Sequence, residues 1–273
     1  MMFNECGVAV FSHVGNSREN QEDNVLFGNG RYLTDRDREE LARTRGAYRA
    51  CYRQPTDRNF LLAVSDGMGG HACGEVASGM TVRWLSERGR QIMESTRVDT
   101  RLLANEIRGL NRSICAYSRQ NPRARGMGAT LCGVVCSGGE YYGFHVGDSR
   151  IYRCTGGRLE RLSVDHTEGQ RLLDLQLLSE AELKTFPRRK NLYRYLGAEA
   201  DPVPDVYQIG FCAPGTTLLL CSDGLTDVIS DRELESVLGG KGGIAKKGEV
   251  LLELALERNP GHGDNITLIL IEF

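Results

Sequence analysis

The chain of 273 residues is long enough for one large domain or two small ones, and its 40% hydrophobic and 26% charged residues are typical of a globular protein. Its formal net charge of −2 gives no overall attraction to polyanions, which argues against a nucleic-acid partner. No apolar stretch approaches the roughly 20 residues that cross a bilayer. The N-terminal residues also lack the basic and long apolar regions of a signal peptide, so we expect a cytoplasmic protein without a membrane partner.

The nine cysteines and five histidines show no spacing that is typical of a metal site. The sequence contains no C-x-x-C pair and no H-x-x-x-H pair, so neither a zinc site nor a disulfide framework is predicted. Buried, reduced thiols are the better interpretation, and they agree with a cytoplasmic location.

Short apolar runs bounded by turn residues predict β-strands along most of the chain. These runs cover residues 6–12, 59–65, 129–136, 141–147, 150–154, 158–163, 216–222 and 266–273. Glycine pairs separate 129–136 from 141–147 and 150–154 from 158–163, which predicts two tight hairpins. Hairpins pair their strands antiparallel, so a doubly wound parallel sheet is not expected.

Helices are predicted where apolar residues recur three and four positions apart. They cover 74–93, 99–120 and 245–258, and capping boxes at Ser179 and Ser230 predict two shorter helices. The stripe that includes Leu103 and Ile107 is the clearest of these patterns. Each stripe is interpreted as a face that packs on the core.

Two polar segments interrupt this pattern. Residues 29–59 are charged and only weakly periodic, so we expect a surface insertion there, and residues 166–190 are polar and basic. Many antiparallel strands with one-sided helices predict a single domain over residues 1–273. The predicted fold class is α+β, a four-layer α-β-β-α sandwich in which two stacked antiparallel sheets are flanked by helices.

Acidic residues stand at the ends of several predicted strands. Asp66, Asp148 and Asp223 each follow an apolar run, and Asp264 opens the last strand. Taken singly, an Asp-Gly after a strand is most often only a turn. Several carboxylates gathered at one edge of a sandwich repel one another unless a cation neutralises them. Oxygen ligands without paired histidine or cysteine suit Mg²⁺ or Mn²⁺.

The residues around these carboxylates indicate a reaction. Two such ions roughly 3.5–4 Å apart can activate a water as a nucleophile. Gly67 lets its carbonyl approach an ion, and Arg18, in a loop with Glu22 and Asp23, offers a guanidinium that fits two phosphate oxygens. Together these groups predict hydrolysis of a phosphoester. The glycines after Asp66 lack the G-x-x-x-x-G-K-[ST] pattern of a phosphate-binding loop.

The chain resembles the protein phosphatase 2C family of metal-dependent serine/threonine phosphatases, in its bacterial form. The matching segments are "SRENQEDN", "LLAVSDGMGGHACGEVAS", "GMGAT", "FHVGDSRIYR", "LSVDHT", "LYRYLGA", "LLLCSDGLTDVIS" and "GDNITLILI". They follow the family's order across nearly the whole chain. The resemblance implies a β-sandwich flanked by helices and hydrolysis of phosphoserine and phosphothreonine in phosphoproteins. A monomer is the default expectation, and a cytosolic phosphatase without other domains is expected to oppose a serine/threonine kinase.

The resemblance also implies a role for each candidate residue. Asp66 would bridge two Mn²⁺ or Mg²⁺ ions. Glu22 and the carbonyl of Gly67 would complete one metal site, and Asp223 and Asp264 would hold the other.

Further roles follow from the same resemblance. Asp148 would help to hold a third, weaker ion, with Asp223 shared. Asp23 would orient ligands or waters from behind them, and Arg18 would bind the substrate phosphate. Residues 166–190 correspond to the flap beside the active site, a segment that affects substrate choice.

One departure from the family concerns the proton donor. Animal members carry a histidine directly after the Asp-Gly, whereas this chain has Met68, as its bacterial relatives do. His71 lies three residues further on and is interpreted as structural. Protonation of the leaving group would then come from a metal-bound water. A pH–rate profile that His71→Ala abolished on the acid side would contradict this hypothesis.

Two other functions stay open. A catalytically inactive member of the family could be a phosphoprotein-binding or regulatory module, because a fold does not guarantee chemistry. Such proteins usually lose metal ligands, whereas the acidic residues are all present here. The third possibility keeps the metals but takes a small-molecule phosphoester as substrate, and rates on phosphopeptides and free phosphometabolites would distinguish it.

Overall fold

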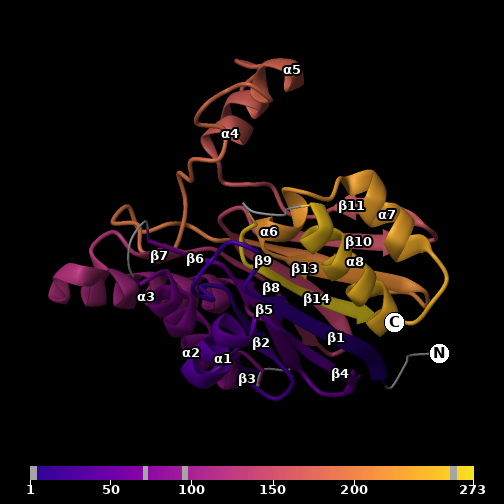
Figure 1. The fold of residues 1–273 in the computed structure, drawn as a ribbon. Coiled ribbons are helices and arrows are strands. Elements are labelled where there is room, and N and C mark those ends of the chain that lie inside the picture. Colours follow the sequence, from indigo (N-terminus) through magenta and orange to yellow (C-terminus); the bar gives the residue numbers. More distant parts are fainter. Residues whose placement is uncertain (1–4, 70–72, 94–97, 259–262) are drawn as a thin grey trace.

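The structure is a computed structural model that describes residues 5–69, 73–93, 98–258 and 263–273. Two six-stranded sheets, antiparallel throughout, are stacked on each other (Figure 1). Sheet A runs in the order β11 (Arg158–Arg161), β10 (Arg150–Thr155), β13 (Thr216–Cys221), β14 (Ile266–Glu272), β1 (Glu5–His13) and β4 (Ala47–Pro55). Sheet B runs in the order β12 (Asp205–Gly210), β9 (Glu140–Val146), β8 (Leu131–Ser137), β5 (Phe60–Ser65), β2 (Asn24–Phe27) and β3 (Arg31–Tyr32). A further pair joins β6 (Gly67–Met68) to β7 (Gly128–Ala129).

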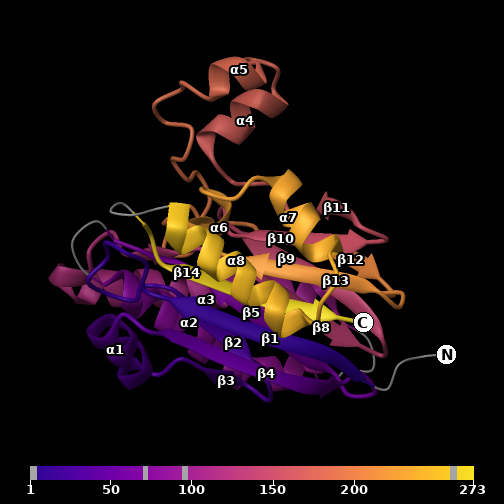
Figure 2. The ribbon, with the colours of Figure 1, turned by 45° about the vertical axis from the view of Figure 1, so that its right-hand side comes forward.

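Helices cover the outer face of each sheet (Figure 2). Sheet B packs against α2 (Gly74–Met93) and α3 (Thr100–Gln120), and sheet A against α7 (Asp231–Gly239) and α8 (Ile244–Arg258). The other described helices are α1 (Asp35–Thr44), α4 (Glu168–Asp174), α5 (Glu180–Leu183) and α6 (Asp223–Thr226), with a 3-10 turn at Pro122–Ala124. Among the described helices, none is both long enough and apolar enough to cross a membrane. The predicted four-layer sandwich is confirmed.

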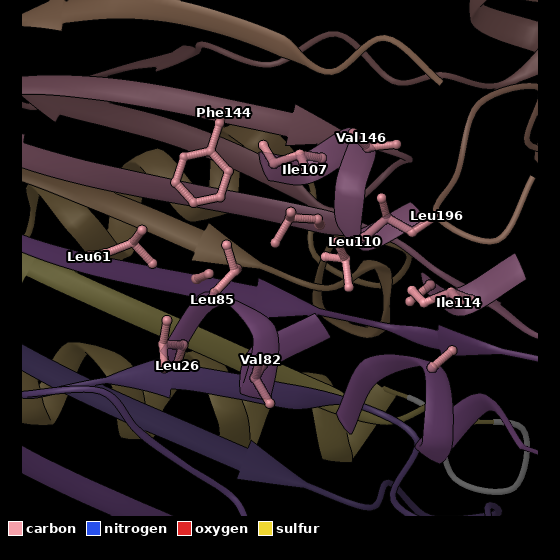
Figure 3. Close-up of a cluster of buried hydrophobic side chains, with 14 of the residues drawn as sticks. Leu26, Leu61, Val82, Leu85, Ile107, Leu110, Ile114, Phe144, Val146 and Leu196 are labelled. Carbon is pink, nitrogen blue, oxygen red and sulfur yellow. The ribbon is translucent and has the colours of Figure 1, made fainter. Parts of the chain in front are cut away.

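Three apolar clusters fill the spaces between the four layers. The cluster between α2, α3 and sheet B contains the stripe of α3, so that Ile107 and Leu110 pack near Phe144 of β9 (Figure 3). A second cluster lies between the two sheets, and a third lies between sheet A, α7 and α8. The helical stripes are therefore core faces, as their spacing predicts.

The two predicted hairpins are present. β8 pairs with β9 across Gly138 and Gly139, and β10 pairs with β11 across Gly156 and Gly157. All four glycines have positive φ, the left-handed conformation that tight reversals require. The capping boxes at Ser179 and Ser230 also form, at the starts of α5 and α7.

Residues 29–59 contain more regular structure than their weak periodicity indicates. A capping box at Thr34 begins α1, and β4 pairs with β1 along its whole length, from Glu5 opposite Pro55 to His13 opposite Ala47. β4 is an edge strand with few buried residues, and this explains the weak apolar pattern. That this segment is an insertion stays a prediction.

Residues 166–190, the flap, project from the end of the sandwich as α4 and α5 (Figures 1 and 2). The two ends of the flap are joined at its base, where the N–H of Glu168 donates to the carbonyl of Asn191 at 2.8 Å. Leu175 and Leu177 are exposed near its tip. The flap is thus joined to the sandwich at its base.

Candidate active site

Strand ends bring the candidate residues to one cavity. Asp66 follows β5, Asp148 lies in the turn between β9 and β10, and Asp223 begins α6 directly after β13. Asp264 precedes β14, and Glu22 lies in the loop between β1 and β2. A cavity of about 570 Å³ is lined by Arg18, Glu22, Asp66, Gly67, Asp148, Asp223 and Asp264 among others. These seven residues, from five segments of the chain, therefore meet in one place.

Two glycines leave room for the backbone to close around Glu22. A Cβ atom on Gly67 would lie 2.1 Å from the carbonyl oxygen of Gly74 and 2.7 Å from that of Glu22. A Cβ atom on Gly74 would lie 2.9 Å from the carboxyl carbon of Glu22. No side chain fits at either position. Gly74, at the start of α2, was not predicted as a site residue, although it is the fourth glycine of "DGMGGHACG".

Asp23 lies behind the cavity and does not line it. Its carboxylate is fully buried, and Oδ2 accepts a hydrogen bond of 2.7 Å from Ser222, the residue directly before Asp223. Burial raises the pKa of Asp23 to about 7. Its contact with Ser222 fits the supporting position that the resemblance implies.

Arg18 lies at the rim of the cavity. Its Nη2 atom donates to Oδ2 of Asp264 at 2.7 Å, and its side chain is half exposed. The bond to Asp264 raises the pKa of the guanidinium, which stays charged. An exposed cation is thereby held beside the carboxylates.

Sequence reasoning missed two charged groups of the site. The ammonium group of Lys190 contacts the carboxylate of Asp227 and lies 3.7 Å from Oδ2 of Asp223. Lys190 ends the basic run "FPRRK" of the flap, and Asp227 belongs to the motif "SDGLTD". The basic run was the available signal, but the sequence does not indicate which acidic residues it meets.

Comparisons with known proteins agree with this geometry. Residues 49–240 match the protein phosphatase 2C family profile. The serine/threonine phosphatase stp of Listeria welshimeri is 34% identical over 219 residues, which cover 79% of this chain and 85% of that relative. The crystal structure of the Mycobacterium tuberculosis serine/threonine phosphatase PstP/Ppp aligns with a TM-score of 0.76 at 30% identity, over 98% of this chain and 99% of that one. The chain belongs to the protein phosphatase 2C family.

Membership defines the activity. The protein is a metal-dependent serine/threonine protein phosphatase, a phosphoric monoester hydrolase whose substrates are phosphoproteins. The catalytic domain of PstP, solved in complex with 2 manganese ions, aligns with a TM-score of 0.72 at 30% identity over 98% of both chains. The predicted family, fold and reaction class are confirmed.

The electrostatics of this phosphatase fit bound cations. Burial raises the pKa of Asp66 well above its usual range, and the nearby carboxylates raise it further. Burial and Asp223 raise the pKa of Asp148 to about 8, and burial with Asp227 raises that of Asp223 to about 6. Within the described chain, the buried Oδ1 atom of Asp223 has no hydrogen-bond partner. Oxygen donors that repel one another suit a hard divalent cation.

The expected position of the proton donor carries no titratable group. Met68 lines the cavity directly after Gly67 and pairs with Gly128 in the short β6–β7 ladder. His71, which we interpret as structural, lies outside the described residues. Protonation of the leaving group by a metal-bound water stays a hypothesis.

Proposed function

We propose that this phosphatase dephosphorylates phosphoserine and phosphothreonine by attack of a water in a site for two divalent cations, Mn²⁺ or Mg²⁺. Asp66 would bridge the cations, Glu22 and the carbonyl of Gly67 would complete one site, and Asp223 and Asp264 the other. When bound, the cations lower the pKa of the attacking water and neutralise phosphate charge. The convergence of these groups in one cavity, with raised carboxyl pKa values, carries the proposal.

Arg18 would hold the substrate phosphate. A guanidinium presents its N–H groups as a planar fork that fits two phosphate oxygens. Arg18 lines the cavity, and its Nη2 atom donates a hydrogen bond to Asp264. Half of the Arg18 side chain is exposed. The remaining N–H groups are available to orient the phosphate toward the carboxylates.

A third, weaker cation would lie at Asp148, with Asp223 shared. Both carboxylates line the cavity, and repulsion by Asp223 helps to raise the pKa of Asp148. Asp23 would support this arrangement from behind, because its hydrogen bond to Ser222 holds the backbone that leads into Asp223.

The surface of the flap favours a protein over a small metabolite as the substrate. Lys190, the last residue of the flap, and Asn191 and Leu192, which follow it, line the cavity. Leu175 and Leu177 expose apolar surface on the same flap, on which the side chains of a protein substrate can pack. We also propose an opposing serine/threonine kinase, a monomer, and a cytoplasmic location, which the nine unpaired cysteines support.

The experiment compares phosphate release from a phosphothreonine peptide and from free phosphometabolites of equal charge, with Mn²⁺ present. A higher kcat/KM for the peptide is expected, and Asp223→Asn should remove activity toward both. Equal or higher kcat/KM for a metabolite would assign the protein to small-molecule phosphoesters instead. An active Asp223→Asn variant would contradict the proposed metal site.

A further inference from the structure

A second cavity, of about 710 Å³, lies between α1 and α2, which are side by side (Figures 1 and 2). We call it the α1–α2 cleft. The residues of α1 that line it are three or four positions apart and therefore share one face of the helix. They are Asp35, Arg38, Glu39 and Ala42. The cleft is thus built partly from residues 29–59, a segment that supplies none of the candidate catalytic residues.

A buried arginine holds α1 against α2. Arg38 is only 6% exposed, and its Nη1 atom donates to the carbonyl of Glu75 at 2.5 Å. Its Nη2 atom donates to Oδ1 of Asp35 at 2.7 Å. A Cβ atom on Gly79 would lie 3.1 Å from Nη2, so the glycine lets the guanidinium lie directly on α2. The width of the cleft is therefore set by contacts within the protein, before anything binds in it.

The floor of the cleft is apolar. Val76 and Met80 of α2 line it and pack on the core cluster beneath them, yet both are only partly buried. Tyr117 of α3 also lines the cleft and is 38% exposed. On the α1 side, Ala42 contributes only a methyl group, which leaves the space open. A concave surface with an exposed apolar floor is typical of a binding site.

The cleft shares a loop with the active site. Asn20 and Gln21 line the cleft, whereas Arg18 and Glu22 of the same loop line the active-site cavity. The hydroxyl of Ser78, on α2, donates to the carbonyl of Glu22 at 2.5 Å and holds this loop against α2. One end of the cleft is therefore next to the residues that would bind the substrate phosphate and a cation.

The length of the cleft fits a short extended peptide. α2 rises about 12 Å between Glu75 and Arg83, at about 1.5 Å per residue. Roughly four residues of an extended chain cover that length. Because alternate side chains of an extended chain point in opposite directions, one or two of them would face the floor. A chain whose phosphorylated residue is bound at Arg18 would run directly past Asn20.

We propose that the α1–α2 cleft is a docking groove for the segment of the phosphoprotein substrate that flanks the phosphorylated residue. Its floor selects an apolar side chain of about the size of leucine. The inference rests on the proposed function, in which the substrate is phosphoserine or phosphothreonine in a protein. The exposed charged residues Glu39 and Arg83 give the cleft a polar rim. None of Ala42, Met80 and Tyr117 lines the active-site cavity, so the cleft acts on substrate choice and not on the chemical step.

Two substitutions test the cleft in opposite ways. Ala42→Trp fills it with an indole ring, and Tyr117→Ala removes part of its floor. Two matched controls accompany them. Ala42→Ser leaves the cleft open, and Arg36→Trp places the same ring at an exposed position of α1 that does not line the cleft. The melting temperature of each variant shows whether the fold is intact, and where Ala42→Trp lowers it, Tyr117→Ala decides.

The substrates are phosphothreonine peptides of equal length in a glycine-serine background, with Mn²⁺ present. Each carries a single leucine at a different position before or after the phosphothreonine, and a peptide without leucine is the reference. In the wild type, we expect leucine on one side of the phosphothreonine to raise kcat/KM about fivefold, as partial burial of one leucine predicts. Ala42→Trp and Tyr117→Ala should lose this gain, whereas Ala42→Ser and Arg36→Trp should keep it. The kcat/KM for an aryl phosphate should be the same in all five proteins.

Equal kcat/KM for every peptide in the wild type overturns the docking groove, and so does a leucine gain that the deciding variant keeps. A loss that falls equally on the aryl phosphate also overturns it, because the cleft would then regulate the active site instead of binding substrate. Failure of the proposed function has a different signature, namely a wild type that hydrolyses the aryl phosphate but releases phosphate from none of the peptides.

Discussion

Asp66 is held more rigidly than a loop residue would be. It follows the last residue of a central strand of sheet B, and its N–H and carbonyl are both hydrogen-bonded to Thr130, at 3.0 and 2.8 Å. A fixed backbone fixes the direction of the carboxylate, as a bridging ligand requires.

Asp66→Asn should lower kcat by about 10²–10³-fold, because a neutral amide cannot bridge two cations. The fold should survive, since the two side chains have the same shape and the backbone bonds to Thr130 remain. Phosphate release and thermal unfolding measure the two effects. Asp57→Asn, at an exposed position, is the control. Wild-type kcat in Asp66→Asn would contradict the assignment.

The raised pKa of Asp148 predicts a pH dependence of stability. Its pKa is about 8 in the folded protein and about 4 in an unfolded chain. Between these values the folded protein binds more protons than the unfolded chain, so its stability falls as the pH rises. The melting temperature of the metal-free protein should therefore decrease from about pH 5 to about pH 8.

Asp148→Asn should reduce this slope, and Mn²⁺ should raise the melting temperature more at the higher pH, where protons compete less. Differential scanning fluorimetry across the pH series measures both. A wild-type slope that Asp148→Asn leaves unchanged would show that another group is responsible.

Residues of the site could be predicted from sequence where the signal is local. Asp66 and Asp223 each follow an apolar run in the same Ser-Asp-Gly context, so their place at a strand end can be inferred without the fold. The contact of Lys190 with Asp227 joins segments 37 residues apart. No local pattern contains that information, because it depends on how the flap returns to the sandwich.

The flap projects from the sandwich and is joined to it at its base (Figures 1 and 2). Replacing residues 172–186 by a short glycine-serine linker removes α5 and the C-terminal end of α4 but keeps the base and the cavity-lining Lys190. The sandwich should keep its melting temperature. We expect kcat/KM for an aryl phosphate to be retained, and KM for a phosphopeptide to rise about fivefold, as loss of about 1 kcal/mol of contacts predicts.

Steady-state kinetics on both substrates test this expectation. Loss of activity toward the aryl phosphate would mean that the flap is part of the catalytic site itself. A peptide KM equal to that of the wild type would remove the flap from substrate recognition.

The stripe of α3 supports the layer that carries Asp66. Ile107 is fully buried between α3 and sheet B. Ile107→Ala should cost about 2–5 kcal/mol of unfolding free energy and Ile107→Val about 0.5–1.5 kcal/mol, because the cavity left is larger in the first. Urea unfolding measures both. Equal small losses would show that α3 is loosely packed.

Helices and strands could be predicted from the sequence where one face of the element is buried and the other exposed. They could not be predicted where few residues of the element are buried. α3 has polar residues on one face and apolar residues on the other, which the sequence displays directly. β4 lies at the edge of sheet A with most of its residues partly or fully exposed, so it lacks that alternation. Its pairing with β1 is set by backbone hydrogen bonds and by the return of the chain after α1, neither of which leaves a residue pattern.

At the scale of the whole molecule, the two stacked sheets account for the site. Asp66 follows a strand of sheet B and Asp223 follows a strand of sheet A, yet both line one cavity. The apolar cluster between the sheets holds these strand ends together. Packing between the sheets thus holds the carboxylates close together although they repel one another, and bound cations would relieve this repulsion.

The most direct test of this account measures phosphate release from a phosphothreonine peptide during titration with Mn²⁺, after all divalent metal has been removed with a chelator. We expect no release without metal, release that increases as Mn²⁺ is added, and almost none at any concentration in Asp66→Asn or Asp223→Asn. Full release in excess chelator would contradict the proposed mechanism.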